Sequence, residues 1–497
     1  MMTRLAFCLL VCLQVALPCT GQVWRKEANY WYFGENAGLR FLPATPANTP
    51  VPVTGDSLIW AGEGTTTISD TNGSLLFYVG QHKDDGFDPH SSVFNKRHLV
   101  MQNGRRAIVG GSSSSQNGIA VRQPGSFRYY YVFSVAQLEN SPSDGLGFYY
   151  TRIDMDTNGG DGMVDPAIRS VQIIPKADEK VTATLHANGR WIWVLTHVRA
   201  TNRFCAVLLT DSGVQQPVFS SVGIMHKDPA DPFGAEVSRG CMKLSPDGRK
   251  IGIAITQPIV QKHYAQILDF DKSTGIVSNP ISIVKDSAIY FGMYGVEFSP
   301  DSKLVYFGDR QRFKIYQYDL RSNDSATIIQ SEYALNSGSL FPTTLQLGID
   351  GRLYYATDLA QPSIRYLRNP DLIGAAVGID TIGIRLLPGT TANYGLTNVL
   401  TSTFDSTARF TSVRPLSLAG RLYPQPARDK VVLLLARPLA ADAMLQITNL
   451  AGIVLQVQNL AAGAASATLD LGPYPAGLYM LRLNDGHQTA AWRLSKE

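Results

Sequence analysis

Oxygen-bearing side chains with the spacing of a calcium loop lie between residues 154 and 165. Asp154, Asp156 and Asn158 occupy the first, third and fifth positions of this stretch, and Asp165 occupies the twelfth. A glycine at the sixth position completes the spacing with which an EF-hand loop wraps Ca²⁺. The flanking segments, however, are patterned as β-strands, and the twelfth residue of such loops is usually Glu. We therefore expect a β-hairpin here, with calcium binding as the alternative.

Two histidines and two cysteines are the other residues with metal or redox chemistry. His186 and His197 stand at opposite ends of two strands joined by a predicted turn, so we expect them to serve packing or the turn and not one metal site. Cys205 and Cys241 are the cysteines that follow the expected signal segment. Each lies in an apolar strand, where a free thiol packs as a small hydrophobic group. A disulfide between them is the alternative, since an oxidising compartment would permit it.

The elements that must position these residues are short strands that repeat along residues 23–404. Polar turns such as residues 70–73, 186–189 and 245–248 recur every ~50 to 65 residues. In such turns Pro presets φ, Asp or Asn bonds the following backbone, and Gly accepts a positive φ. A second strand, rich in aromatic or branched residues, follows each turn, as at residues 129–133. Because no amphipathic helix interrupts this pattern, the sequence predicts an all-β fold, and the period predicts a β-propeller.

Six blades are visible in full, and a seventh is predicted where the ends of the repeat region meet. Residues 394–400 have the character of an innermost strand, but no second strand follows them. Residues 29–34 and 38–42 look like a second and a third strand that lack a first. Joining these segments would close the ring and hide its edge strands. We therefore predict a seven-bladed propeller over residues 22–404, with six blades as the alternative.

One mouth of a propeller channel collects the loops that enter the innermost strands. This geometry predicts a group of side chains at the mouth: Glu63, Ser114, Gln116, Arg239, Tyr294, Phe341 and Tyr394. Aromatic, amide and charged groups of this kind suit the stacking and hydrogen bonding of a saccharide or peptide. The alternative is that they only fill the channel and its rim. The sequence contains no nucleophile elbow, zinc-ligand spacing or phosphate-binding loop, so we assign no catalytic residue.

The N-terminal segment predicts export. A basic start at Arg4 precedes an apolar run from Leu5 to Leu17, and small residues follow it, as in a secretory signal peptide. At roughly 13 residues the run is too short to span a bilayer, which needs about 20. We therefore assign residues 1–21 to a signal peptide, with a lipoprotein cysteine at Cys19 as the alternative. Charged residues make up 17% of the chain and its net charge is +4, which predicts no binding of nucleic acid or of an anionic membrane.

The last part of the chain predicts a separate β module. Residues 405–420 lose the repeat and are expected to form a linker, and several apolar strands follow within residues 421–497. A small antiparallel sandwich of Ig-like kind is the natural solution for such strands. The residues that carry its most distinctive motifs are Tyr423, Pro424, Pro426, Gly477 and Tyr479.

These motifs resemble the type A C-terminal sorting domain of the Bacteroidetes type IX (Por) secretion system. Gln425 departs from the pattern, since the family usually has Asn there. Residues 31–39, 67–73 and 294–301 also resemble secreted propeller-like proteins that often carry such tails. The resemblance implies export through the type IX machinery and delivery to the cell surface or medium. It implies no settled biochemical activity.

The sequence therefore predicts an exported binding or adhesion-type protein. Its expected partners are an extracellular glycan or protein and, through the tail, the type IX machinery. We predict no transmembrane span, and calcium is the one cofactor that the sequence suggests. The alternative function is an extracellular polysaccharide hydrolase or lyase at the channel mouth, which would need a pair of acidic or basic groups converging in one cleft.

Overall fold

The structure is a computed structural model, and β-strands dominate it. The described residues are 26–41, 50–55, 59–138, 147–226, 235–256, 262–286, 292–404, 420–435, 438–439, 441–449, 454–484 and 489–497. The expected signal peptide and nearly all of the expected linker lie outside these residues. The α-helices within them are short, α1 (Ala235–Ser238) and α2 (Ser325–Gln330). No helix in the described parts of the chain has the length and apolar character that crossing a membrane requires.

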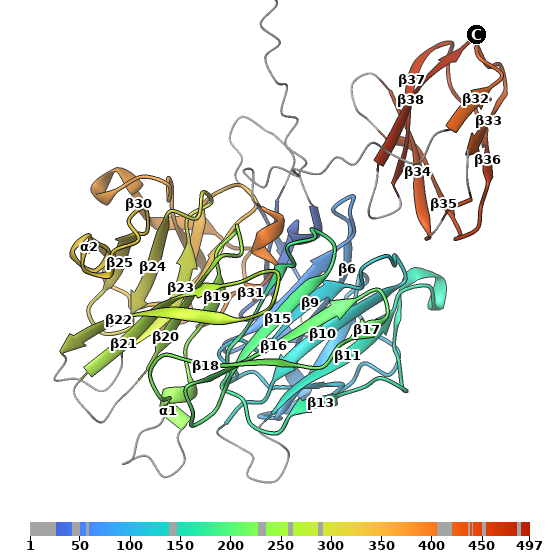
Figure 1. The fold of residues 1–497 in the computed structure, drawn as a ribbon. Helices are drawn as coiled ribbons and strands as arrows, with labels where there is room; N and C mark the ends of the chain where they lie inside the picture. Colours follow the sequence, from blue (N-terminus) through green and yellow to red (C-terminus); the bar gives the residue numbers. More distant parts are fainter. Residues whose placement is uncertain are drawn as a thin grey trace, which may run out of the picture.

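The described strands between Tyr30 and Asn398 form seven small sheets. Figure 1 shows several of them next to one another, such as the sheets that contain β10, β15 and β20. The first three are sheet 1, with β1 (Tyr30–Phe33), β2 (Ala37–Arg40) and β3 (Val51–Thr54); sheet 2, with β4 (Ile59–Trp60), β5 (Thr65–Ser69), β6 (Leu75–His82), β7 (His90–Asn95), β8 (Ile108–Val109) and β31 (Thr397–Asn398); and sheet 3, with β9 (Gly118–Arg122), β10 (Tyr129–Val135), β11 (Phe148–Asp154), β12 (Met163–Val164) and β13 (Val171–Ile174).

The remaining four sheets continue in chain order. They are sheet 4, with β14 (Val181–Leu185), β15 (Ile192–Val198), β16 (Arg203–Thr210), β17 (Gly213–Val214) and β18 (Val218–Ser221); sheet 5, with β19 (Met242–Leu244), β20 (Lys250–Ile255), β21 (Lys262–Phe270) and β22 (Val277–Asp286); sheet 6, with β23 (Met293–Phe298), β24 (Leu304–Asp309), β25 (Lys314–Asp319) and β26 (Tyr333–Asn336); and sheet 7, with β27 (Pro342–Leu347), β28 (Leu353–Thr357), β29 (Ser363–Leu367) and β30 (Ile379–Arg385).

Each predicted turn joins two paired antiparallel strands. The turn at residues 245–248, for example, connects β19 to β20, and Gly248 has a φ of +72° there. Ser302 occupies the glycine position of the corresponding turn between β23 and β24. It adopts a φ of +62° all the same, a conformation that side chains normally avoid. Turn chemistry at these positions therefore determines where the hairpins form.

Apolar cores join consecutive sheets. One cluster of buried residues packs sheet 3 on sheet 4, and others pack sheet 4 on sheet 5, sheet 5 on sheet 6 and sheet 6 on sheet 7. Sheets 1, 2 and 3 are joined in the same way. A further cluster joins sheet 7 to sheet 1, where the Trp31 ring meets the edge of Tyr354 at 5.4 Å between centroids. The packing of the seven sheets is therefore cyclic.

The two ends of this cycle meet in a different way from the one expected. β31 pairs in parallel with β5, with Thr397 opposite Thr65, and it does not pair with β1. β1 contacts β5 instead, through a side chain, because Thr65 Oγ1 in β5 donates to the carbonyl of Tyr32 in β1 at 2.8 Å. Glu35 and Thr391 then join sheet 1 to the later chain through two backbone hydrogen bonds of 2.9 and 3.2 Å.

The C-terminal module consists of two antiparallel sheets, drawn in orange and red in Figure 1. Their strands are β32 (Gly420–Tyr423), β33 (Lys430–Leu435) and β36 (Ser466–Asp470) in one, and β34 (Ala443–Asn449), β35 (Val454–Leu460), β37 (Gly477–Asn484) and β38 (Thr489–Lys496) in the other. Inward-facing residues of both sheets, including Leu433, Leu445 and Leu481, form one buried core. That core contains no residue of the seven sheets, so the module has a hydrophobic core of its own.

Candidate ligand-binding site

The loops that enter the inner strands are joined to one another by backbone hydrogen bonds. The bonds are Glu63 N to Ser112 O (2.7 Å), Gly64 N to Ser114 O (2.9 Å), Gln116 N to Glu179 O (3.1 Å), Glu179 N to Ser238 O (3.2 Å), Cys241 N to Tyr294 O (2.7 Å) and Thr344 N to Tyr394 O (3.3 Å). Two close backbone approaches complete the circle, because a Cβ atom at Gly295 would lie 2.0 Å from the carbonyl oxygen of Thr343, and one at Gly395 would lie 1.7 Å from that of Glu63. These loops therefore form one continuous rim.

Buried polar side chains join the inner strands inside this rim. Lys243 Nζ donates to Gln346 Oε1 at 2.5 Å and to Asn398 Oδ1 at 2.8 Å, and it lies 4.0 Å from Glu297. The Asn398 amide in turn donates to backbone carbonyls of β9 and β14. Burial lowers the pKa of Lys243 and raises the pKa of Glu297. These four residues, the central plug, join strands of six sheets, so the protein's own buried side chains hold the inner strands to one another.

An open hollow lies at the rim, beside the segment that carries Glu63. Its volume is about 110 Å³, and its lining combines aromatic, hydroxyl and carboxylate groups from Trp60, Gly62, Glu63, Phe87, Ser112, Ser113 and Tyr394. Phe87 is 56% exposed, which is unusual for a phenylalanine. The hollow therefore offers flat apolar faces next to hydrogen-bonding groups.

A cluster of charged and aromatic groups supports one wall of the hollow. The hydroxyl of Tyr294 donates to Glu63, and the guanidinium of Arg310 lies 5.1 Å from the centre of the Tyr294 ring. The same guanidinium lies 4.9 Å from the Tyr394 ring centre and donates to the Tyr394 hydroxyl at 3.3 Å. Burial, with the neighbouring Glu63 carboxylate, holds the pKa of Tyr294 well above its ordinary value. Tyr294 is therefore a neutral donor that orients Glu63.

The structure brings together only part of the residue group expected at the mouth. Glu63, Tyr294 and Tyr394 are neighbours in the hollow and its wall. Ser114 and Gln116 are buried instead, and the Gln116 side chain bonds the backbone of Met242 from both its oxygen and its nitrogen. That side chain therefore joins the rim together.

Two further members of the expected group lie elsewhere on the rim. Arg239 is half-buried, and its carbonyl accepts a bond of 2.7 Å from Lys180. Phe341 stacks on Phe313 with ring centroids 4.1 Å apart. Neither residue lines the hollow.

The acidic residues at positions 154–165 do not converge on a common centre. They form a hairpin between β11 and β12. Arg128 donates to both oxygens of Asp154, at 2.9 and 2.6 Å, and Arg152 donates to Asp165 at 2.9 Å. Asp156 is exposed, and the Asn158 amide donates to Gln102 at 2.7 Å. Arginines therefore occupy the two carboxylates on which a calcium ion would most depend.

The cysteines and the tail motif have simple surroundings. Cys205 and Cys241 are free, buried thiols that belong to two different apolar clusters. In the tail, Tyr423 is 72% exposed, and Pro424, Pro426 and Gly477 are exposed beside the sheets. Tyr479 is buried, and its hydroxyl donates to the Pro475 carbonyl at 2.6 Å.

The side chain of Gln425 holds the start of the tail motif to the last strand. Its oxygen accepts from the backbone N–H of Ser495 at 3.1 Å, and its nitrogen donates to the Arg493 carbonyl at 3.3 Å.

Comparison with known proteins identifies the C-terminal module. Residues 421–497 match the family model of the secretion system C-terminal sorting domain. Such a domain implies that the protein is exported to the cell surface or the medium and interacts with the type IX machinery. No curated protein matches this chain.

Several solved structures resemble the chain at low identity. The lectin BP39L of Burkholderia pseudomallei shares 10% identity over 69% of this chain and 92% of its own, with a TM-score of 0.41. The Dos1 propeller shares 9% over 69% and 78%, with a TM-score of 0.40. The periplasmic gluconolactonase PpgL of Pseudomonas aeruginosa shares 13% over 74% and 96%, with a TM-score of 0.33.

Sequence reasoning missed three aromatic or basic residues of the site: Trp60, Phe87 and Arg310. Phe87 and Arg310 lie in loops that leave the second strands of their sheets, β6 and β24. In an antiparallel sheet such a loop lies at the same end as the loop that enters the first strand. Phe87 and Arg310 could therefore have been predicted from the sequence by considering the loops that leave the second strands together with the loops that enter the first strands.

Proposed function

We propose that this chain is an exported or cell-surface binding protein that holds an extracellular glycan in the hollow at its rim. The observation that carries the proposal is the combination of Trp60, Phe87 and Tyr394 with Glu63 and two serines in one open depression. Sugar rings present C–H faces that stack on aromatic rings and hydroxyls that bond carboxylates and serines. A protein ligand, the other partner expected from the sequence, would need a larger contact surface than this hollow supplies.

We infer that the seven sheets are the blades of a β-propeller and that the C-terminal module is an Ig-like sandwich. The cyclic packing of the sheets and the continuous rim of entering loops support the first inference. Two antiparallel sheets around one core support the second. The propeller would then be the binding part, and the module the sorting part.

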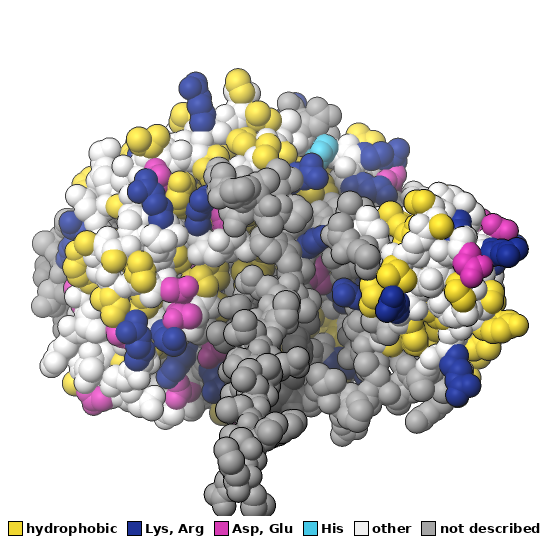
Figure 2. All heavy atoms as spheres, turned by 90° about the horizontal axis from the view of Figure 1, so that it is seen from above, with side chains coloured by type: hydrophobic (Ala, Val, Ile, Leu, Met, Phe, Trp, Pro, Cys, Tyr) yellow, Lys and Arg dark blue, Asp and Glu magenta, His cyan; other side chains and the backbone are white. Residues whose placement is uncertain are grey.

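Surface charge agrees with a neutral ligand. Basic and acidic side chains are interspersed with apolar ones over the face that Figure 2 shows. The net charge of the whole chain is +4. A polyanionic ligand would be expected to select a continuous basic surface.

The alternative function, polysaccharide cleavage, has less support from the hollow. Hydrolysis of a glycosidic bond normally uses two carboxyl groups, about 5 to 10 Å apart. Among the described residues, the lining of the hollow contributes one carboxylate, Glu63, and that group accepts a hydrogen bond from the Tyr294 hydroxyl. Binding therefore fits the residues better than catalysis does.

The proposal can be tested by glycan-array screening of residues 22–497, followed by calorimetric titration of any bound glycan. We expect Phe87→Ala and Trp60→Ala each to weaken binding about tenfold or more, which corresponds to about 1.4 kcal/mol. Reducing-end release should stay at background in the same samples, because the hollow lacks a second carboxylate among the described residues.

Tyr333→Ala is the matched control, since Tyr333 is 40% exposed on β26 and lies outside the hollow. Its affinity should equal that of the wild type. The hollow would be excluded as a glycan site if no glycan on the array bound the protein. It would also be excluded if Phe87→Ala and Trp60→Ala bound the glycan with the same affinity as Tyr333→Ala.

A further inference from the structure

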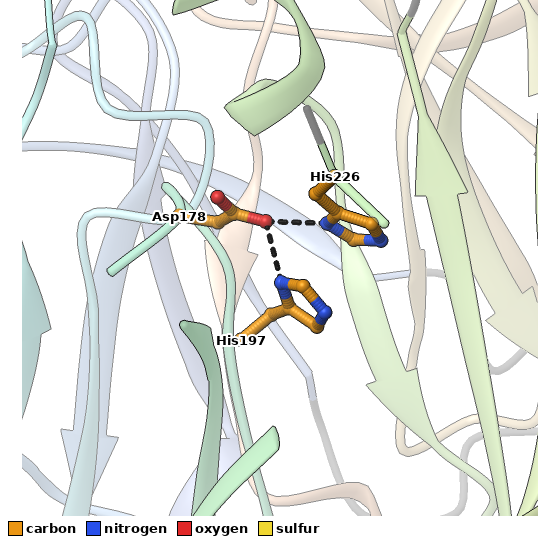
Figure 3. Close-up of side chains that lie close together, drawn as sticks. All are labelled: Asp178, His197 and His226. Carbon is orange, nitrogen blue, oxygen red and sulfur yellow. Dashed lines mark hydrogen bonds and ion pairs between the residues drawn. The ribbon is translucent and has the colours of Figure 1, made fainter. Parts of the chain in front are cut away.

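Two histidines and one aspartate form a buried cluster outside the hollow (Figure 3). Asp178 precedes β14, His197 belongs to β15, and His226 follows β18. Asp178 and His197 are completely buried, and His226 is 1% exposed. Segments that are up to 48 residues apart in the sequence therefore meet at this point.

One carboxylate oxygen holds both imidazole rings. Oδ2 of Asp178 lies 3.0 Å from Nδ1 of His197 and 2.5 Å from Nδ1 of His226. Figure 3 shows the two rings turned toward this oxygen from different sides. Their centroids are 3.6 Å apart, with 23° between their planes. The donor atoms of the three residues thus converge on one small volume.

Some buried polar atoms of this cluster have no hydrogen-bond partner in the part of the chain that the structure describes. Asp178 Oδ1 and the Nε2 atoms of His197 and His226 are buried, and none has a partner among the described residues. An unsatisfied buried polar atom costs about 1–3 kcal/mol, and native proteins keep few of them. The unpartnered Oδ1 belongs to the carboxylate that faces both rings, and it indicates that a further partner belongs at this carboxylate.

The spacing of the three residues is close to that of a zinc site. Each residue offers one ligand atom, and these atoms all lie within 4.8 Å of one another. Ligand atoms around a tetrahedral Zn²⁺ with bonds of about 2.0–2.1 Å are roughly 3.3 Å apart. The distances of 3.0 and 2.5 Å from Asp178 Oδ2 to the two Nδ1 atoms are shorter than this, so the carboxylate would draw back by less than about 1 Å to admit an ion, and its second oxygen is available as a further ligand.

We propose that Asp178, His197 and His226 bind one divalent transition-metal ion of the zinc type. Two nitrogen ligands favour such an ion over Ca²⁺ and Mg²⁺, which prefer oxygen. The site is closed to solvent, so the ion is structural and not catalytic. It joins the segment after β18 to β14 and β15, and it compensates the buried carboxylate.

The direct test is the metal content of residues 22–497, prepared without an affinity tag, loaded with Zn²⁺ and freed of excess ion. We expect mass spectrometry to find about one Zn²⁺ per chain, as for a saturated single site. Loading with Co²⁺ should give the visible absorption of a tetrahedral nitrogen and oxygen site. A chain that retains no Zn²⁺ after loading would overturn the proposal.

A matched pair of variants assigns the ion to this cluster. His226→Gln should lower Zn²⁺ affinity at least about 100-fold, because it removes a ligand. His186→Gln should bind like the wild type, since His186 lies outside the cluster and packs on the half-buried Trp191, with 5.4 Å between ring centroids. Equal Zn²⁺ binding by His226→Gln and the wild type would contradict the assignment.

A thermal measurement covers the case in which His226→Gln fails to fold. A chelator should lower the Tm of the loaded wild type and of His186→Gln by several degrees, because the ion binds the folded state. A Tm that a chelator does not change, in a wild-type sample that contains Zn²⁺, would show that the ion lies elsewhere.

Discussion

Burial controls the chemistry of single residues throughout the seven sheets, and the two cysteines show its effect most clearly. Burial raises the pKa of the Cys205 thiol to about 12 and that of the Cys241 thiol to about 11. A thiol must lose its proton to react or to exchange, so both are held in an inert form at neutral pH. They also lie in different core clusters, which leaves each to pack as a small apolar group.

We predict that neither thiol of residues 22–497 reacts with a thiol reagent in the native protein. After unfolding in denaturant without a reductant, about two thiols per chain should react, because both are free. The absorbance of the chromophore that the reagent releases gives the number of reactive thiols per chain, first in the native and then in the unfolded protein. Fewer than two reactive thiols in the unfolded chain would mean that a disulfide forms in solution.

At the scale of the elements, short loops hold the inner strands to one another. Gly395 precedes β31 and approaches the Glu63 carbonyl so closely that only hydrogen fits there. Asn398, within β31, then bonds the backbones of β9 and β14 and the side chain of Lys243. β31, a strand of two residues, is therefore held to several sheets mainly by the side chain of Asn398, and less by its short backbone pairing with β5. Its position depends on one close backbone approach and on the central plug.

We predict that Gly395→Ala lowers the free energy of unfolding by about 3 kcal/mol, because a Cβ atom would collide with backbone that cannot move aside. Urea titration monitored by tryptophan fluorescence measures the loss. Gly389→Ala is the control, since Gly389 has a φ of +79° and nothing lies within 4 Å of the point that a Cβ atom would occupy. It should cost only about 1–2 kcal/mol of backbone strain. Equal losses in the two variants would contradict the role assigned to the close approach.

At the scale of the whole molecule, the hydrophobic core of the C-terminal module is separate from those of the seven sheets. The seven sheets close their packing on themselves where sheet 7 meets sheet 1. The C-terminal module closes a second core between its two sheets. Since the core of the module contains no residue of the seven sheets, we expect each part to keep its fold without the other and the sorting domain to act as a separable address.

We predict that deletion of residues 421–497 leaves the seven sheets folded but stops export, so that the shortened protein accumulates in the periplasm. Cell fractionation and immunoblotting measure the location, and near-ultraviolet circular dichroism checks the fold. The full-length chain is the control for export. Truncated protein found at the cell surface or in the medium would contradict the role of the tail.

Local chemistry made most of the fold predictable from the sequence. Turn residues such as those at 245–248 select a hairpin by their own φ preferences and hydrogen bonds, whatever surrounds them. The alternation of apolar strands with such turns then indicates an all-β fold. The motif around Tyr423 is likewise contiguous, so the sorting domain could be recognised directly. The turns, the strands and the sorting motif depend on residues that are adjacent in the chain, so the sequence alone determined them.

The tertiary structure decided everything that depends on distant segments meeting. The parallel pairing of β31 with β5, the approach of Phe87 to Tyr394 and the meeting of His226 with Asp178 join residues far apart in the chain. Sequence spacing carries no information about such contacts, because cyclic packing brings loops of different sheets to one rim. The calcium spacing at residues 154–165 shows the converse. Local spacing left a calcium loop as the alternative to a hairpin there, and arginines pair with two of its carboxylates in the folded chain.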